Sequence, residues 1–168
     1  MRTIEFDDPV FYDKKIQELN VLLEALDWIE NQYPICQKGE TEEGTFPEVY
    51  FNDGTEKNIQ VLPEGSAVSF FQIEGDIIGN DEFDYEIPFS LTVWADLTEI
   101  HPEKSYDYTS ELVSDVLGVL NDNSCYDLKI KTADALEDFT MLQKLLKQPQ
   151  MRPYTAFKIS FKCNLTKC

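Results

Sequence analysis

The longest regular alternation of apolar and polar residues in the chain runs from Phe83 to Ala95. Its odd positions are Phe, Tyr, Ile, Phe, Leu, Val and Ala, whereas its even positions are polar or proline except for Trp94. Because side chains alternate between the two faces of a strand, this pattern predicts a strand with one face in a core and the other in solvent. A strand of about thirteen residues exceeds the usual length of about five or six, and we expect it to project toward a partner.

Two segments carry apolar residues at three- and four-residue spacing and predict amphipathic helices. The first covers residues 14–33, with Asp13 as its cap and Pro34 just beyond its end. The second covers residues 109–120. A helical insertion of similar spacing is predicted at residues 133–148.

Short β-branched or alternating segments predict five further strands, at residues 46–51, 59–62, 67–74, 126–131 and 155–165. Polar residues 37–45 and 75–82 predict loops, Asn52-Asp53-Gly54 predicts a turn, and residues 1–12 predict an extended arm. This order predicts a single α+β domain over residues 1–168. Its sheet is mostly antiparallel with a long central hairpin strand, packed by the N-terminal helix and a second amphipathic helix.

Charge is unevenly distributed along the chain, whose net charge is −18 at pH 7. Residues 1–128 hold 29 acids and 6 bases, a net of −23, and residues 129–168 hold 3 acids and 8 bases, a net of +5. One interpretation is a solvated acidic surface. The other is head-to-tail contact between copies, weakened by salt, through the basic residues Lys129, Lys131, Lys158 and Lys162. Sequence-specific duplex binding is disfavoured because it needs clustered basic residues.

An acidic segment precedes the long strand and is the candidate interaction loop, with Trp94 as a second candidate contact. The acids of this loop are Glu74, Asp76, Asp81, Glu82 and Asp84. A solvated loop and a surface facing a partner or a channel both fit this composition. A metal site is not predicted, since the loop lacks the calcium-binding order of alternating acids followed by glycine.

The sequence carries little that indicates catalysis. His101 is the single histidine and lies before a proline in a polar segment, and no nucleophile-elbow or phosphate-loop motif is present. The four cysteines have no paired spacing that would suggest zinc, and we expect reduced, mostly buried thiols. We therefore predict no enzyme activity, no cofactor and no metal. No apolar run approaches a membrane span and no secretion signal is evident.

Three segments in order carry a resemblance to a known family. They are the strand segment Ile87–Trp94, the helix Tyr108–Leu120 and the late strand Tyr154–Phe161. Together with the N-terminal helix and the predicted hairpin, this order resembles the tail-terminator and related neck, or head–tail connector, proteins of tailed bacteriophages. The resemblance covers most of the chain as an order of elements.

The resemblance implies a structural virion protein of the neck or tail, assembled in the host cytoplasm. It implies a homo-oligomeric ring, six- or twelve-fold, that contacts neighbouring neck, portal or tail proteins and joins the head to the tail. DNA would pass through an acidic lumen without sequence-specific binding. The alternative is an acidic soluble binding module, or a DNA mimic that occupies a basic protein surface.

Overall fold

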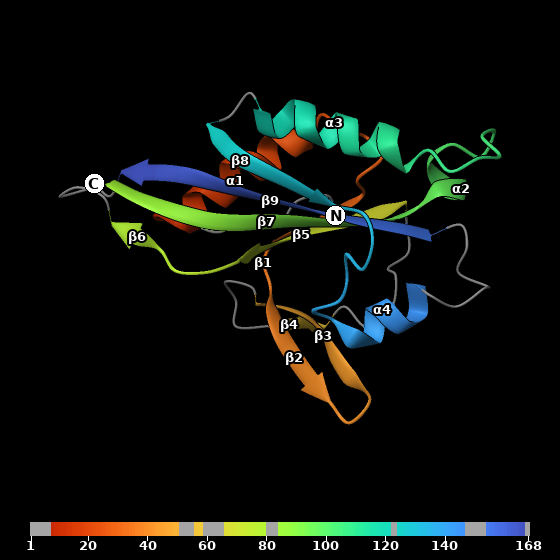
Figure 1. Cartoon of the computed structure of the whole chain (residues 1–168), viewed down its shortest axis with the longest axis horizontal. Helices are drawn as coiled ribbons and strands as arrows, with labels where there is room; N and C mark the ends of the chain where they lie inside the picture. The colour runs from red at the N-terminus through yellow and green to blue at the C-terminus, as the bar shows by residue number, and fades with distance from the viewer. Residues whose placement is uncertain are drawn as a thin grey trace.

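A twisted central sheet organises the computed structural model, which describes residues 8–50, 56–58, 66–79, 84–121, 124–146 and 154–166 (Figure 1). The helices are α1 (Tyr12–Leu23), α2 (Leu97–Ile100), α3 (Thr109–Asn121) and α4 (Thr140–Leu146). The strands are β1 (Asn31–Ile35), β2 (Gln37–Thr41), β3 (Gly44–Tyr50), β4 (Glu56–Asn58), β5 (Ala67–Ile73), β6 (Ile78–Gly79), β7 (Asp84–Asp96), β8 (Cys125–Lys131) and β9 (Tyr154–Thr166).

The central sheet has the strand order β1-β5-β7-β9-β8, and β6 also pairs with β7. The β1–β5 pairing is parallel and the other pairings are antiparallel. Helices α1 and α3 lie on one face, while α4 and the smaller sheet β2-β3-β4 lie on the opposite side (Figure 1). The predicted α+β class, with a mostly antiparallel sheet and a long central strand, is confirmed. None of the described helices is long and apolar enough to cross a membrane.

Strands β7 and β9 form the longest ladder of the sheet. Both have 13 residues, and they pair without interruption from Asp84 opposite Thr166 to Asp96 opposite Tyr154. The odd positions of β7, starting at Ile87, face α1 and α3 and are buried there with apolar residues of both helices. The helix-side half of the predicted alternation is therefore confirmed, and this core fixes the strand register because a slip by one residue would expose it.

The prediction that the other face of the long strand is solvated is wrong for its second half. Ser90, Thr92 and Trp94 are each at most 1% exposed. A second apolar cluster covers this end of the sheet, with members Tyr33, Cys36, Val49, Val68, Phe70, Trp94, Ala135, Leu136, Phe139, Leu142 and Ala156. Trp94 is thus buried within the chain, where its ring meets Tyr154 edge-on at 6.3 Å. Because this second cluster covers the indole of Trp94, the side chain is not available at the surface of the single chain for the predicted contact.

Helix α1 ends ten residues earlier than the predicted helix 14–33. Backbone bonds from Ala25 to Leu22 and from Leu26 to Leu23 tighten the chain into turns, after which residues 31–35 form β1. The buried and partly buried apolar residues of α1, of the turns and of β1 together happen to continue a three- and four-residue spacing. This spacing explains why the predicted helix was too long. Pro34 lies inside β1, an edge strand, where a missing N–H is tolerated.

The predicted cap of α1 is also corrected. The helix begins at Tyr12, and Phe11 occupies the cap position without a side-chain hydrogen bond. Asp13 lies in the first turn instead, where partial burial raises the pKa of its carboxyl group. The described part of the predicted arm, residues 8–11, leads directly into this helix.

The polar segment 37–45 is a hairpin, not a loop. Strand β2 pairs with β3 from Gln37 opposite Glu48 to Thr41 opposite Gly44. Every residue of β2 is exposed except Gly39, which packs under the ring of Phe46 so closely that a Cβ would lie 2.4 Å from it. A strand without apolar alternation gives no periodic signal, which explains the error.

The remaining predicted elements are confirmed, confirmed in part, or lie outside the described residues. The strands at 46–51, 67–74, 126–131 and 155–165 and the helix at 109–120 are confirmed within a few residues as β3, β5, β8, β9 and α3. The insertion 133–148 is helical in part, because residues 133–139 form turns before α4. The turn Asn52-Asp53-Gly54, the strand 59–62 and residues 1–7 lie outside the described residues.

A reciprocal pair of threonines joins α4 to the smaller sheet. The Thr45 amide donates to Thr140 Oγ1 at 2.9 Å, and the Thr140 amide donates to Thr45 Oγ1 at 2.8 Å. Thr45 Oγ1 also lies 3.0 Å from the carbonyl oxygen of Asp138, to which it donates. Gly44 precedes this contact with φ 142°, and a Cβ there would lie 2.4 Å from Thr140 Oγ1. The N-terminus of α4 is therefore capped by a residue from a distant strand.

Replacing Thr45 by valine should lower the free energy of unfolding by about 1–2 kcal/mol, because the amide at the start of α4 loses its acceptor at nearly constant side-chain volume. Denaturant unfolding measures the change. Thr166→Val is the matched control, since its hydroxyl bonds Asp84 at an exposed site and should cost less than about 0.5 kcal/mol. Equal losses in the two variants would contradict the capping role.

Burial of Trp94 predicts two results for a chain in which Trp28 is replaced by phenylalanine. The remaining Trp94 fluorescence should be shielded from acrylamide, because the indole is 1% exposed. Trp94→Ala should lower the free energy of unfolding by about 3–5 kcal/mol, as expected for deletion of a large core side chain. Efficient quenching of the folded monomer, or a loss below about 1 kcal/mol, would place Trp94 at the surface.

Candidate interaction surface

The second face of the central sheet changes from apolar to polar along its length. At the covered end it presents Val68, Phe70, Trp94 and Ala156 to the smaller sheet and α4. Further along, cross-strand neighbours on the same face are polar, as where Gln72 faces Ser90. We call the remaining stretch the polar face; its residues are Glu86, Pro88, Tyr126, Lys129, Ser160, Lys162 and Asn164.

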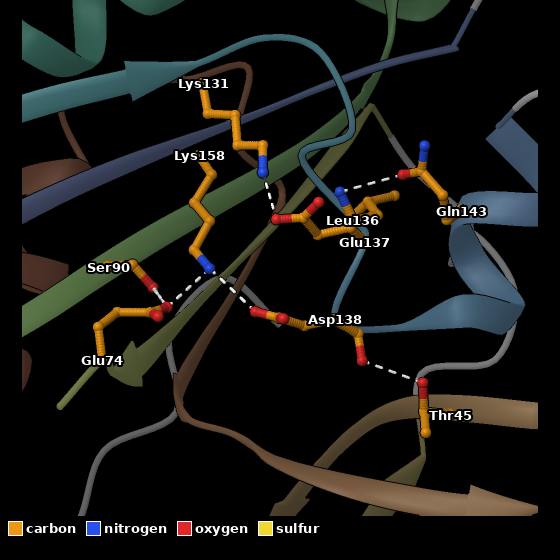
Figure 2. Close-up of polar contacts among 9 residues, drawn as sticks. All are labelled: Thr45, Glu74, Ser90, Lys131, Leu136, Glu137, Asp138, Gln143 and Lys158. Atoms are coloured by element: carbon orange, nitrogen blue, oxygen red, sulfur yellow. Dashed lines mark hydrogen bonds and ion pairs between the residues drawn. The ribbon is translucent and has the colours of Figure 1, made fainter.

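Lys158 lies on β9 between Ala156 of the covered end and Ser160 of the polar face. Figure 2 shows its side chain between Glu74 and Asp138. Its Nζ lies 2.7 Å from Glu74 Oε1 and 3.0 Å from Asp138 Oδ2. Ser90 Oγ donates to the same Glu74 oxygen at 2.5 Å. Burial by itself would lower the pKa of Lys158, but the hydrogen bonds to the two carboxylates raise it above the ordinary value. This charged group therefore ties β5, β9 and the segment before α4 together inside the chain.

A second set of charges lies within the polar face. Lys162 Nζ lies 3.6 Å from Glu86 Oε1 and 3.5 Å from Asp127 Oδ2. Tyr126 donates its phenolic proton to Glu86 Oε2 at 2.5 Å, and burial together with this bond raises the pKa of Tyr126 to about 12. Asp127 has φ 55° at the point where the β8–β9 register shifts. The bulge places its carboxylate on the polar face beside Lys162.

Three of the four lysines predicted to bind another subunit are paired within the chain. Lys158 and Lys162 hold the carboxylates described above, and Lys131 forms an ion pair with Glu137 (Figure 2). Lys129 is exposed and has no ion pair with a described residue. Because β9 lies beside β7 and β8, basic residues from the last part of the sequence thus pair with acidic residues from its first part.

The predicted acidic loop likewise divides into residues with different surroundings. Glu74 belongs to the Lys158 network, and Asp84 accepts a hydrogen bond from Thr166 Oγ1 at 2.8 Å. Asp76 is exposed, whereas Asp81 and Glu82 lie outside the described residues. Neutralising all five acids would therefore disturb an internal contact, and Glu74 is better treated separately from a surface charge.

The sequence-based prediction did not include two adjacent isoleucines in this segment. Ile77 is 36% exposed and Ile78 is 53% exposed. Strand β6 fixes the second of them, since Ile78 pairs with Glu86 on β7. The available signal was an Ile-Ile pair between glycines in an otherwise acidic loop. We call Ile77, Ile78 and Asp76 the hairpin patch.

The described residues contain no cluster of histidine, cysteine or carboxylate side chains that could hold a metal ion. His101 lies after α2 in the loop where it was predicted, with Nδ1 3.4 Å from Glu103 Oε1. The hairpin patch and the polar face present apolar, carboxylate and ammonium groups to the outside. Such surfaces are suited to contact with another protein chain.

Within the Lys158 network, Glu74→Gln should lower the free energy of unfolding by about 1–2 kcal/mol, because a half-buried ammonium loses one of its two carboxylates. Asp76→Asn is the matched control two residues away and should change it by less than about 0.5 kcal/mol. Denaturant unfolding of both variants, and of each combined with Lys158→Met, measures the coupling. A Glu74→Gln effect that persists unchanged in the Lys158→Met background would contradict a direct interaction.

No protein-family model matches the chain, and a search of curated proteins found no match. Among solved structures, the chain aligns with a chain of the sheath/tube terminator, in its extended state, of an extracellular contractile injection system named PVC. The sequence identity is 10% and the TM-score is 0.31. The alignment covers 96% of this chain but spans 59% of the length of that chain.

Proposed function

We propose that the chain is a structural, non-catalytic subunit of a phage-tail-type particle, which associates with copies of itself and with neighbouring tail or neck proteins. The order of elements that resembles tail terminators supports this proposal, and β7, α3 and β9 occur where that resemblance expects them. The observation that carries the proposal is the hairpin patch. There two adjacent isoleucines are exposed in the segment that leads from β5 to β7.

Exposed isoleucines at and beside a paired strand favour association. Burying one such side chain fully contributes about 1.5–3 kcal/mol, so even partial burial of Ile77 and Ile78 would stabilise a contact appreciably. The short strand β6 holds Ile78 in a fixed position beside β7. A side chain held in this way loses less conformational entropy on binding than the same side chain in an unpaired loop. The hairpin patch is therefore the centre of the proposed contact.

The ion pairs within the chain change the expected role of charge. Lys131, Lys158 and Lys162 are already matched by carboxylates of the same chain, while the net charge remains −18. Copies of such a chain repel one another at long range, and the contact must overcome this repulsion. In a ring around a channel, the same excess of negative charge would let DNA pass without adhering to the surface.

Salt should consequently strengthen self-association, which reverses the expectation from the charge distribution along the sequence. At about 1 M salt the Debye length is near 3 Å, so repulsion between copies is screened while apolar contact persists. Sedimentation velocity over a range of salt concentrations measures the shift. Dissociation on adding salt would show instead that attraction between opposite charges drives the contact, with Lys129→Glu as the variant to identify its basic partner.

The hairpin patch is tested by the double variant Ile77→Ser and Ile78→Ser. Folding should be retained, since both side chains are exposed, and the self-association of the parent chain should fall at least about tenfold, the loss expected for about 1.4 kcal/mol of contact. Val21→Ser is the matched control, because Val21 is 51% exposed on α1, away from the patch. Equal association of all three chains would reject the patch as the contact.

Electron microscopy of the associated protein tests the ring itself, with a closed six-fold or twelve-fold assembly as the expected result. A chain that stays monomeric at high concentration and with tail proteins present would contradict the proposal. Tight, salt-sensitive binding of that monomer to a basic protein would instead support the acidic binding module.

A further inference from the structure

Two cysteines far apart in the sequence lie opposite one another at the edge of the central sheet. Cys125 opens β8 and Cys163 lies near the end of β9, and the two are direct partners in the antiparallel register. Their Sγ atoms are 3.6 Å apart, across a sequence separation of 38 residues. Cys163 is fully buried and Cys125 is 9% exposed, both on the helix side of the sheet.

The geometry is close to that of a disulfide. A disulfide needs an S–S distance of about 2.05 Å and Cβ atoms about 3.5–4.5 Å apart, so the two sulfurs must approach by about 1.5 Å. Directly opposite residues of antiparallel strands have Cβ atoms about 4.5–5.5 Å apart. Rotation of the two side chains and a small movement of one strand suffice. An edge strand such as β8 can make that movement without displacing β7.

We propose that Cys125 and Cys163 are a dithiol site that a small-molecule disulfide, of the oxidised glutathione class, converts into a cross-strand disulfide joining β8 to β9. The site lies outside the hairpin patch and the polar face, and the proposal does not depend on self-association. Its consequence is mechanical. A covalent bond would prevent separation of the edge strand from the β7–β9 ladder.

The exchange proceeds in two balanced steps. The Cys125 thiolate attacks one sulfur of the small disulfide, whose S–S bond breaks and releases one small thiolate. Cys163 then gives up its thiol proton to solvent and its thiolate attacks Cys125 Sγ, which releases the second small thiolate. Two protein thiols are oxidised, and the small disulfide is reduced to two thiols.

The surroundings assign different roles to the two sulfurs. The hydrogen bond from the Cys163 thiol lowers the pKa of Cys125, although burial opposes this, and the charge of Lys15 lowers it further. Donating that hydrogen bond, together with burial, raises the pKa of Cys163. Cys125, the more exposed of the two, is therefore the attacking group, and Cys163 resolves the mixed disulfide.

The end of β8 that carries Cys125 has an irregular backbone. Ser124 has φ 63° and Asp127 has φ 55°, conformations that are uncommon for residues other than glycine. The β8–β9 register shifts between Tyr126 and Lys129, so Cys125 is held by a short stretch of regular ladder. Opening of this stretch admits a small disulfide to Cys125 while the long ladder stays intact.

Cys36 is separated from this site, because it belongs to the apolar cluster on the opposite face of the sheet. Burial raises the pKa of the Cys36 thiol and makes it a poor nucleophile. The structure therefore predicts selective reaction at the Cys125–Cys163 pair. Cys168 lies outside the described residues. The experiment accordingly removes both Cys36 and Cys168.

The test uses the full chain with Cys36→Ala and Cys168→Ser, incubated folded with oxidised glutathione. Mass spectrometry should show an intramolecular link between peptides containing Cys125 and Cys163 and a mass loss of two hydrogens. The oxidised chain should melt about 5–15 °C higher than the reduced chain, as expected for closing a loop of this length. Adding Cys125→Ala to the same background should abolish both the link and the rise in melting temperature.

Three results would overturn the proposal. They are thiols that stay reduced in the folded chain and link only after denaturant is added, a link between two chains instead of within one, and an oxidised chain that melts no higher than the reduced one. The folded state of the parent variant and of the Cys125→Ala control is confirmed by circular dichroism before oxidation. Dilute protein keeps the measurement separate from self-association.

Discussion

The uninterrupted pairing of β7 with β9 is the constraint on which the rest of the structure depends. It joins residues 84–96 to residues 154–166, so the central sheet is complete only when the two ends of a long stretch of chain have met. Contacts of such sequence separation form late and at a cost in loop-closure entropy. The ladder in turn supplies one face to α1 and α3 and the other to the smaller sheet and α4.

The same ladder explains how a chain with an acidic first part and a basic last part can fold at a net charge of −18. It sets Lys158 and Lys162 of β9 beside strands that lead to Glu74 and carry Glu86, and each lysine finds two carboxylates. These attractions between opposite charges are thus satisfied within the chain. The proposed self-association would then depend more on apolar contact, for which exposed Ile78 of β6 is suitably placed.

Sequence patterning predicted the elements whose burial is one-sided or strictly periodic. The alternation at 155–165 and the spacing at 109–120 gave β9 and α3 nearly to the residue. Sequence patterning failed where a side chain is buried by a segment that lies far away in the sequence. Trp94 looked like an exception on a polar side because nothing in its own segment shows that residues near Leu136 cover it. Tyr33 continued a helical spacing while lying in β1, and the exposed strand β2 gave no periodicity. The pairing of Cys125 with Cys163 needed the sheet register, which no local pattern contains.

Native-state hydrogen exchange tests the central role of the β7–β9 ladder most directly. The amides that cross between these two strands should be the slowest in the chain and should exchange only with global unfolding, because both faces of the ladder are buried over much of its length. The β2–β3 hairpin and the start of β8 should exchange through smaller, local openings. If the β7–β9 amides exchanged as fast as those of the β2–β3 hairpin, the ladder would not be the element that holds the fold together, and this account would be wrong.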